Sequence, residues 1–150
     1  MGKIVNAEVE INSVSIAVCT DVDSVWSVVR PMLQKVVTQS PDDLSIEKIY
    51  HRLVAGNDLL ILISTGTEFL ASITMRIKTT DTGVRVLYLP VVSGNKMDTW
   101  LDKFLDFAEE IARDHQCAQI RGTGRNGWVK KLKSRGWNDM FTTIAYNVEG

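Results

Sequence analysis

The hydrophobic period of this chain changes near residue 97, and that change constrains the fold more than any other feature of the sequence. Before it, short turns rich in Thr, Gly and Asp separate three apolar segments, at residues 59–64, 68–78 and 84–92. Turns of this length connect antiparallel neighbours, so the segments predict an antiparallel meander. After it, residues 98–115 place apolar side chains at the 3.6-residue period of an α-helix.

A strand, a helix and a strand are predicted beyond that helix. Residues 118–122 and 141–148 have the composition of strands, and residues 126–135 form a basic helical segment between them. This order predicts a parallel pair with a right-handed crossover. An antiparallel meander that leads into one parallel unit is an uncommon combination, which narrows the choice of folds.

The first third of the chain predicts one more strand and two helices. Residues 13–18 alternate apolar and smaller side chains, as a strand does. Thr20 is expected to cap a helix, and Pro31 should kink or divide that helix. Residues 40–43 are a second helix-start signal, and Gly56 followed by Asn57 is the stop signal.

Composition and organisation indicate one ordinary globular unit. No linker, repeat or low-complexity segment is present, so residues 1–150 are predicted to form a single domain of α/β (α+β) class. Apolar residues make up 45% and charged residues 23%, which is typical of globular proteins. The 17 Lys and Arg nearly cancel the 18 Asp and Glu, and this balance disfavours nucleic acid and membranes as partners.

The compartment is predicted to be the cytoplasm. The apolar runs are too short to cross a bilayer, and the first residues lack the apolar core of a signal peptide. Cys19 and Cys117 lie far apart, and no second Cys or His stands at metal-ligand spacing from either. We therefore expect two buried, reduced thiols and no metal.

Two segments of the chain resemble the N-acetyltransferase (GNAT) superfamily. Residues 109–118 (EEIARDHQCA) are similar to the end of the family's central helix and its step into the fifth strand. Residues 125–137 (RNGWVKKLKSRGW) are similar to the last helix and its glycine-aromatic exit, in a form that resembles GNAT-like proteins of tailed bacteriophages. The resemblance implies a GNAT-like mixed sheet with flanking helices over essentially the whole chain.

The resemblance also implies a cleft for acetyl-CoA between the fourth and fifth strands. The family's fourth strand is bulged there, and Pro90 suits a place where strand pairing ends. The pyrophosphate of the cofactor binds N–H groups at the start of the central helix. The cofactor-binding residues that the resemblance implies are Val91, Val92, Gly94, Lys96, Thr99, Leu101, Asn126 and Lys130.

One family motif is altered at this cleft. Its sequence is Arg/Gln-x-x-Gly-x-Gly/Ala, and its small residues let the backbone approach the phosphate oxygens. These two small positions fall on Thr99 and Leu101, while Gly94 lies several residues too early. The Leu101 side chain is expected to crowd a pyrophosphate.

The family's general acid is also replaced. Many members carry a Tyr four residues before the exit glycine, where its hydroxyl can protonate the leaving thiolate. This chain has Leu132 at that position. Tyr88 and Tyr146 are candidate replacements, and Tyr88 is the candidate catalytic residue.

Six cations within 15 residues form the most unusual charge cluster, and no acid lies among them: Arg121, Arg125, Lys130, Lys131, Lys133 and Arg135. Such a cluster can contact the phosphates of CoA, dock on an acidic partner, or form a solvated face. In the last case the acidic face of residues 98–109 balances it. A role as a nucleic-acid-binding module is disfavoured, because aromatic residues do not alternate with the basic ones.

Two function hypotheses remain. In the first, the chain is a GNAT-fold protein with an eroded acetyl-CoA site and a binding or structural role, such as a phage accessory or virion protein. It would then contact phage or host proteins through residues 125–135. In the second, it is an active N-acetyltransferase that uses acetyl-CoA to modify a primary amine, because alignment of the reactants supplies much of the barrier reduction.

Overall fold

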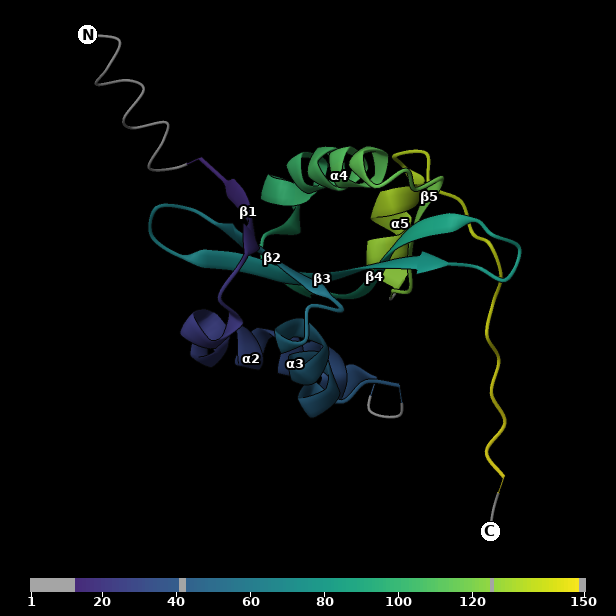
Figure 1. Cartoon of the computed structure of the whole chain (residues 1–150), viewed down its shortest axis with the longest axis horizontal. Helices are drawn as coiled ribbons and strands as arrows, with labels where there is room; N and C mark the ends of the chain where they lie inside the picture. The colour runs from purple at the N-terminus through teal and green to yellow at the C-terminus, as the bar shows by residue number, and fades with distance from the viewer. Residues whose placement is uncertain (1–12, 41–42, 125, 149–150) are drawn as a thin grey trace, which may run out of the picture.

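The computed structural model describes residues 13–40, 43–124 and 126–148, and these form one five-stranded sheet between two helical layers (Figure 1). The strands lie in the order of the chain: β1 (Ser15–Cys19), β2 (Leu59–Ser64), β3 (Phe69–Thr79), β4 (Arg85–Gly94) and β5 (Gln119–Gly122). Neighbours are antiparallel from β1 to β4, and β5 is parallel to β4. The mixed sheet predicted from the sequence is therefore confirmed, but the parallel pair is β4 with β5, across α4, and not residues 118–122 with 141–148.

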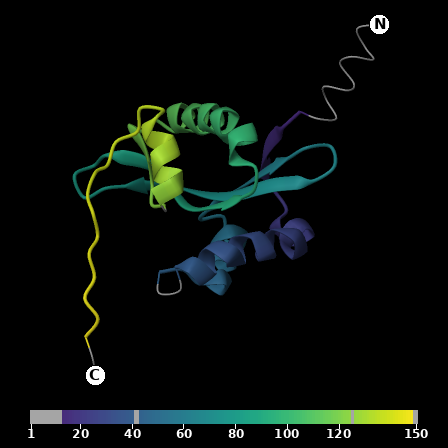
Figure 2. The ribbon, with the colours of Figure 1, turned by 180° about the vertical axis from the view of Figure 1, so that it is seen from behind.

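Two helices cover each face of the sheet. The helices α2 (Val22–Gln39) and α3 (Ile46–Val54) lie on one face, and α4 (Met97–Asp114) and α5 (Asn126–Lys133) lie on the other (Figures 1 and 2). The apolar run of β2 explains why both faces are covered. Leu60 packs in the cluster with α2 and α3, whereas Ile61 and Ile63 pack in the cluster with α4.

The α4 side holds the larger core. Trp100 and Phe104 are fully buried there and make an edge-to-face contact, with ring centroids 6.2 Å apart. Ala108 is fully buried one turn further along the helix. These residues recur at the helical spacing that the sequence predicted for 98–115, so that prediction is confirmed.

The first two helices differ from the prediction in their boundaries. Asp21, and not Thr20, caps α2, because its carboxylate accepts the N–H of Ser24 at 3.3 Å. The helix then continues through Pro31, so of the predicted kink or division the division is wrong. Val29 and Leu33 flank that proline and are fully buried against the sheet, and their packing offsets the hydrogen bond that a proline removes.

The start of α3 also lies later than predicted. The helix begins at Ile46, and the Ser45 side chain caps it by accepting the N–H of Lys48 at 3.4 Å. The predicted signal at residues 40–43 includes residues 41 and 42, which lie outside the described part of the chain. The true cap follows the same chemistry at the next serine along the chain.

The predicted closing strand is wrong. Residues 141–148 have no strand partner in the structure and run away from the body as an extended tail (Figure 1). Phe141 is 78% exposed and Ile144 is 89% exposed. The alternating side chains suit an extended segment, but none of the described strands pairs with it.

A bulge in β4 sets the geometry of the candidate site. Thr74 lies opposite Val91 and Arg76 opposite Tyr88, so Leu89 and Pro90 together face the single residue between them on β3. The extra residue reverses which face of the sheet the following side chains occupy. Leu89 packs with the α4 cluster, whereas Val91, two residues later, packs with the α2 and α3 cluster. Pairing of β4 with β5 ends at Leu89, directly before the proline. The predicted position of Pro90 where pairing ends is confirmed.

Candidate functional site

The candidate site lies where β4 and β5 separate and α4 begins. Beyond the Leu89–Gly122 pair β4 and β5 are no longer hydrogen-bonded to each other, and β4 continues to Gly94 paired only with β3. Three residues later α4 starts at Met97. The first N–H groups of a helix lack intrahelical acceptors and carry a partial positive charge, so this position is suited to an anion.

Lys96 forms the junction between β4 and α4. It is the N-cap residue, it has left-handed backbone with φ of 54°, and its side chain makes no capping hydrogen bond. The Lys96 ammonium instead contacts the Glu68 carboxylate at 3.0 Å on the exposed surface. A lysine therefore occupies a conformation that glycine adopts most easily.

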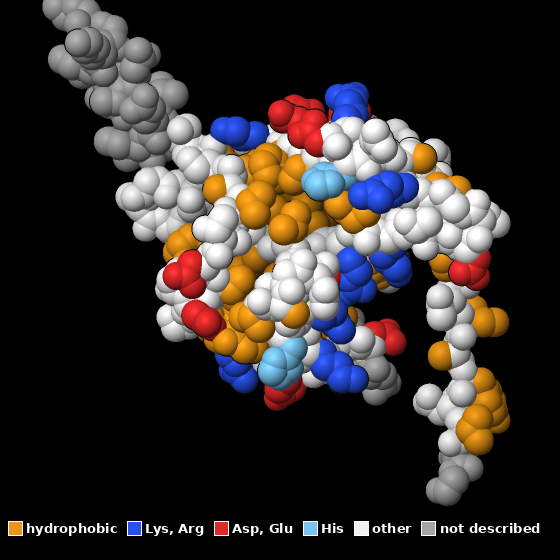
Figure 3. Space-filling view, in the orientation of Figure 1, with side chains coloured by type: hydrophobic (Ala, Val, Ile, Leu, Met, Phe, Trp, Pro, Cys, Tyr) orange, Lys and Arg blue, Asp and Glu red, His pale blue; other side chains and the backbone are white. Residues whose placement is uncertain are grey.

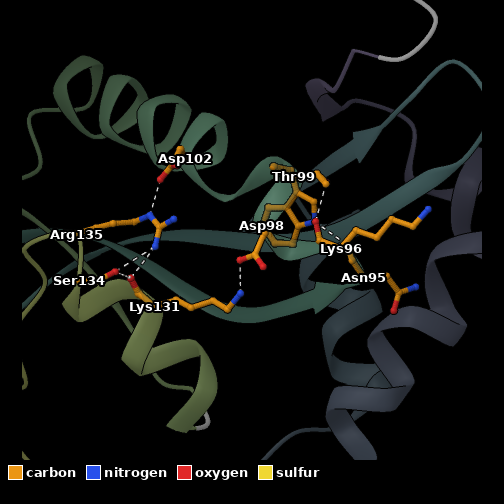
Figure 4. A network of polar contacts seen from close by, with 9 residues as sticks. Asn95, Lys96, Asp98, Thr99, Asp102, Lys131, Ser134 and Arg135 are labelled. Atoms are coloured by element: carbon orange, nitrogen blue, oxygen red, sulfur yellow. Dashed lines mark hydrogen bonds and ion pairs between the residues drawn. The ribbon is translucent and has the colours of Figure 1, made fainter.

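The first turn of α4 holds this junction in place (Figure 4). Both the N–H and the hydroxyl of Thr99 donate to the carbonyl of Lys96, at 2.9 and 2.7 Å. The indole N–H of Trp100 donates to the carbonyl of Asn95 at 2.8 Å. The Thr99 hydroxyl, a cofactor-binding candidate, is thus used in a local hydrogen bond.

Leu101 does not face the helix N-terminus. Its side chain is fully buried in the core cluster between the sheet and α4. The expected obstruction of a pyrophosphate by this side chain is therefore wrong, because a core side chain cannot crowd a ligand at the surface. The exposed positions in the first turn are Asp98 and Thr99, and the Asp98 side chain is 81% exposed.

Two ion pairs beside this turn join α4 to α5 and to the residues that directly follow it. Asp98 accepts from the Lys131 ammonium, and Asp102, one turn later, accepts from the Arg135 guanidinium (Figure 4). The hydrogen bond from Arg135 lowers the pKa of Asp102, and the same bond raises the pKa of Arg135. The proposed balance between the basic cluster and the acidic face of α4 is confirmed for these two pairs, which we call the interhelix ion pairs.

An acidic side chain lies at the α4 N-terminus, where the resemblance implies the pyrophosphate of acetyl-CoA. The Asp98 carboxylate already places a negative charge in the first turn, and the Lys131 cation is bonded to that carboxylate. A pyrophosphate would meet this charge at close range and would have to break the ion pair with Lys131. The sequence analysis assigned Asp98 only to an acidic helix face. Its position in the first turn of the helix is the feature that could have identified it as part of the site.

The remaining candidates do not converge on one ligand position. Tyr88 lies on β4 before the bulge, half-buried, with the Lys78 ammonium 4.6 Å from the ring centroid. Val91 is buried against α2 and α3, whereas Val92 packs on the α4 side. Gly94 ends β4 in close contact with β3.

The candidates on and beside the last helix likewise supply no acid. Asn126 is the first residue of α5, and Lys130 is exposed on the same helix. Leu132 is buried in the core and brings no hydroxyl near the cleft. Tyr146 is 89% exposed on the tail and does not replace it.

The described residues contain neither a metal-binding cluster nor a membrane-spanning helix. No group of three or more His, Cys, Asp or Glu side chains there is close enough to bind a metal ion. None of the described helices combines the length and apolar character that a membrane span requires. Cys19 and Cys117 are unpaired as expected, but each is partly exposed and not buried.

Comparison with solved structures identifies the fold. An acetyltransferase from Trypanosoma brucei superposes with a TM-score of 0.67 and 14% identity, over 91% of this chain and all of that one. A predicted acetyltransferase with acetyl-CoA from Clostridium acetobutylicum gives 0.67 and 11%, over 89% and 96%. Glucosamine-6-phosphate N-acetyltransferase from Arabidopsis thaliana gives 0.67 and 10%, over 92% and 100%.

These similarities define an α+β protein with the GNAT acetyltransferase fold. No protein-family model matches the sequence, and no curated protein matches it. At these identities the likeness establishes the fold alone, and the function has to be argued from the site.

Proposed function

We propose that this chain is a GNAT-fold protein that acts by binding and not by acetyl transfer, in a role such as that of a phage accessory or virion protein. The observation that carries the proposal is the Asp98 carboxylate in the first turn of α4, held by Lys131 of α5. The fold retains the bulge and the strand separation of an acetyl-CoA cleft. The charge at its anion position has the wrong sign for the cofactor.

The lack of a general acid supports the same proposal. Leu132 is buried at the position that the resemblance gives to a tyrosine, and Tyr88 lies on the strand segment before the bulge. Leu132 has no proton to deliver to a thiolate, and the Tyr88 ring contacts the Lys78 ammonium. Catalysis would have to depend on alignment of the reactants alone, in a site that repels one of them.

Titration with acetyl-CoA tests this proposal. We expect the wild-type protein to give no heat of binding in low-salt calorimetry. The Asp98→Asn variant should give a measurable heat of binding, because the repulsion is removed and Lys131 becomes available to a phosphate. Glu110→Gln, an exposed change on the same helix far from its N-terminus, should behave like wild type. Micromolar binding by the wild-type protein would contradict the proposal.

The partner surface that we propose is the basic helix, residues 125–135. Three of its cations are paired with acids: Lys131 and Arg135 with α4, and Lys133 with Asp139 at 2.6 Å. The Lys130 side chain is exposed to solvent, where a partner can contact it. An acidic surface on a phage or host protein is the complementary partner.

A charge reversal on this helix tests the surface. Lys130→Glu should weaken binding of a fluorescent poly-glutamate peptide by roughly fivefold, the size of one exposed ion pair. The loss should shrink as salt is raised, because exposed charges are screened. Lys35→Glu, an equal charge change on exposed α2, is the matched control and should have a smaller effect. Equal losses in both variants would show that only net charge matters.

The alternative function is an active N-acetyltransferase for a primary amine. One observation favours it: β4 and β5 separate at Pro90, as an acyl-CoA cleft requires. It also agrees with the acetyl-CoA complex among the similar structures. Acetylation of one or more amines in a panel of primary amines by the wild-type protein would establish this alternative.

A further inference from the structure

A groove runs along the outer edge of the sheet, on the side of β5 away from β4. Its volume is about 680 Å³, and it is bounded by α4, β5 and residues 135–140. Leu105, Ile120, Trp137 and Met140 form its apolar wall. The groove is separate from the candidate cofactor site, which lies on the β4 side of β5.

The outer edge of β5 has no strand beside it among the described residues. The sheet ends with β5, which pairs only with β4 over four residues. The backbone N–H and C=O groups on its other side are therefore available to a further strand. The groove next to this edge has one apolar wall and is otherwise lined by polar and charged side chains. An added strand would gain backbone hydrogen bonds from the edge and side-chain burial against that wall.

The tail, residues 138–148, has the pattern of such a strand. Met140, Ile144, Tyr146 and Val148 lie two or four residues apart and therefore share one face of an extended chain. Their exposed fractions are 55%, 89%, 89% and 86%. No charged residue lies from Met140 to Val148. Figure 3 shows these apolar side chains standing in solvent beside the body of the protein.

We propose that the tail of a second copy of this chain forms a strand along the outer edge of β5, and that two copies exchange tails reciprocally. The tail starts at the groove, since Asn138 and Met140 line it, and yet runs away from its own body (Figure 1). An extended segment of eight residues spans about 26 Å, which is enough to reach a neighbouring copy and cover its β5. Reciprocal exchange uses the same two surfaces twice and so closes as a twofold dimer.

This inference goes beyond the proposed function and does not depend on it. The exchanged strand would complete the sheet that the sequence pattern predicts, with residues 141–148 as its sixth strand. Its apolar face would meet Leu105 and Ile120 of the partner copy's groove, and the backbone would pair with β5. Each tail would thereby remove from water the side chains that one chain alone leaves exposed.

The mass of the full chain in solution tests the exchange. Light scattering coupled to size exclusion should give a dimer for wild type and a monomer for the Ile144→Asp, Tyr146→Asp variant, because charges on the apolar face prevent docking. Thr143→Asp, which lies on the other face of the tail, should remain a dimer. Circular dichroism of all three proteins controls for folding. A wild-type monomer, or a dimer that survives the double change, would overturn the proposal.

A disulfide trap distinguishes exchange from a tail that folds back on its own β5. In a Cys19→Ser, Cys117→Ser background, we would pair Gln119→Cys on the exposed start of β5 with Ala145→Cys on the tail. Oxidation should give a covalent dimer on a non-reducing gel. A cross-linked product of monomer mass would show an intramolecular strand and overturn the exchange.

Discussion

Replacing Asp58 with alanine should lower the free energy of unfolding by about 3 kcal/mol. The Asp58 side chain is 2% exposed and accepts two hydrogen bonds from Arg76, at 2.6 and 2.9 Å. Removing one partner of a buried ion pair typically costs about 3–5 kcal/mol, because the other charge stays buried and unpaired. Arg76 is about a quarter exposed, so it can partly hydrate, and we expect the lower end of that range.

A second guanidinium also depends on Asp58. The Nε atom of Arg52 lies 3.6 Å from the carboxylate, and it is buried without a hydrogen-bond partner of its own. The hydrogen bonds to Asp58 raise the pKa of Arg76, so that guanidinium keeps its charge in the folded state. The Asp58→Ala variant therefore leaves two cations facing one vacated position, where β2 begins after α3.

Urea denaturation of three proteins measures this loss. Asp58→Asn keeps an acceptor for Arg76 but not the charge, and should lie between wild type and Asp58→Ala. Asp81→Ala changes an exposed turn residue of the same type, and should stay within about 0.5 kcal/mol of wild type. If Asp58→Ala lost no more than Asp81→Ala, the pair would contribute nothing to stability.

The fold could be predicted from the sequence because its elements carry strong periodic signals. The helix at 97–114 and the three meander strands follow directly from the spacing of apolar residues. Pro90 could be placed at the end of pairing because proline cannot donate to a ladder. The continuity of α2 through Pro31 could not be predicted, since it depends on burial of Val29 and Leu33 against a sheet formed elsewhere.

The candidate site was harder to predict because its chemistry depends on register. A shift of a few residues decides whether Leu101 or Asp98 faces the helix N-terminus, and the local sequence contains no glycine motif to fix that shift. The interhelix ion pairs join residues 33 apart, and only the packing of α5 on α4 brings them together. The tail shows a third limit, since a strand pattern specifies an extended segment but not the chain with which it pairs.

Gly94→Ala is expected to destabilise the protein by about 3 kcal/mol, because Gly94 lies against β3 where β4 ends. A Cβ atom at this position would lie 2.5 Å from the Cβ of Ala71 and 2.6 Å from the carbonyl oxygen of Leu70. The φ of Gly94 is 156°, in the region that side chains rarely adopt. Overpacking against fixed atoms typically costs about 1–3 kcal/mol, and backbone strain adds to it.

The Gly94→Ala substitution should also disturb the start of α4. A substitution that only strains the backbone of a glycine would not do so. The carbonyl of Leu70 accepts the N–H of Asn95 at 2.8 Å, so displacing that carbonyl loosens the junction that positions Asp98. Thermal melting should show a fall of roughly 6–12 °C, as about 3 kcal/mol implies for a domain of this size. Gly83→Ala also has positive φ, at 87°, but its added Cβ meets nothing within 4 Å, and it should cost only about 1 kcal/mol. Equal losses for the two variants would mean that backbone conformation, and not contact with β3, fixes the glycine at 94.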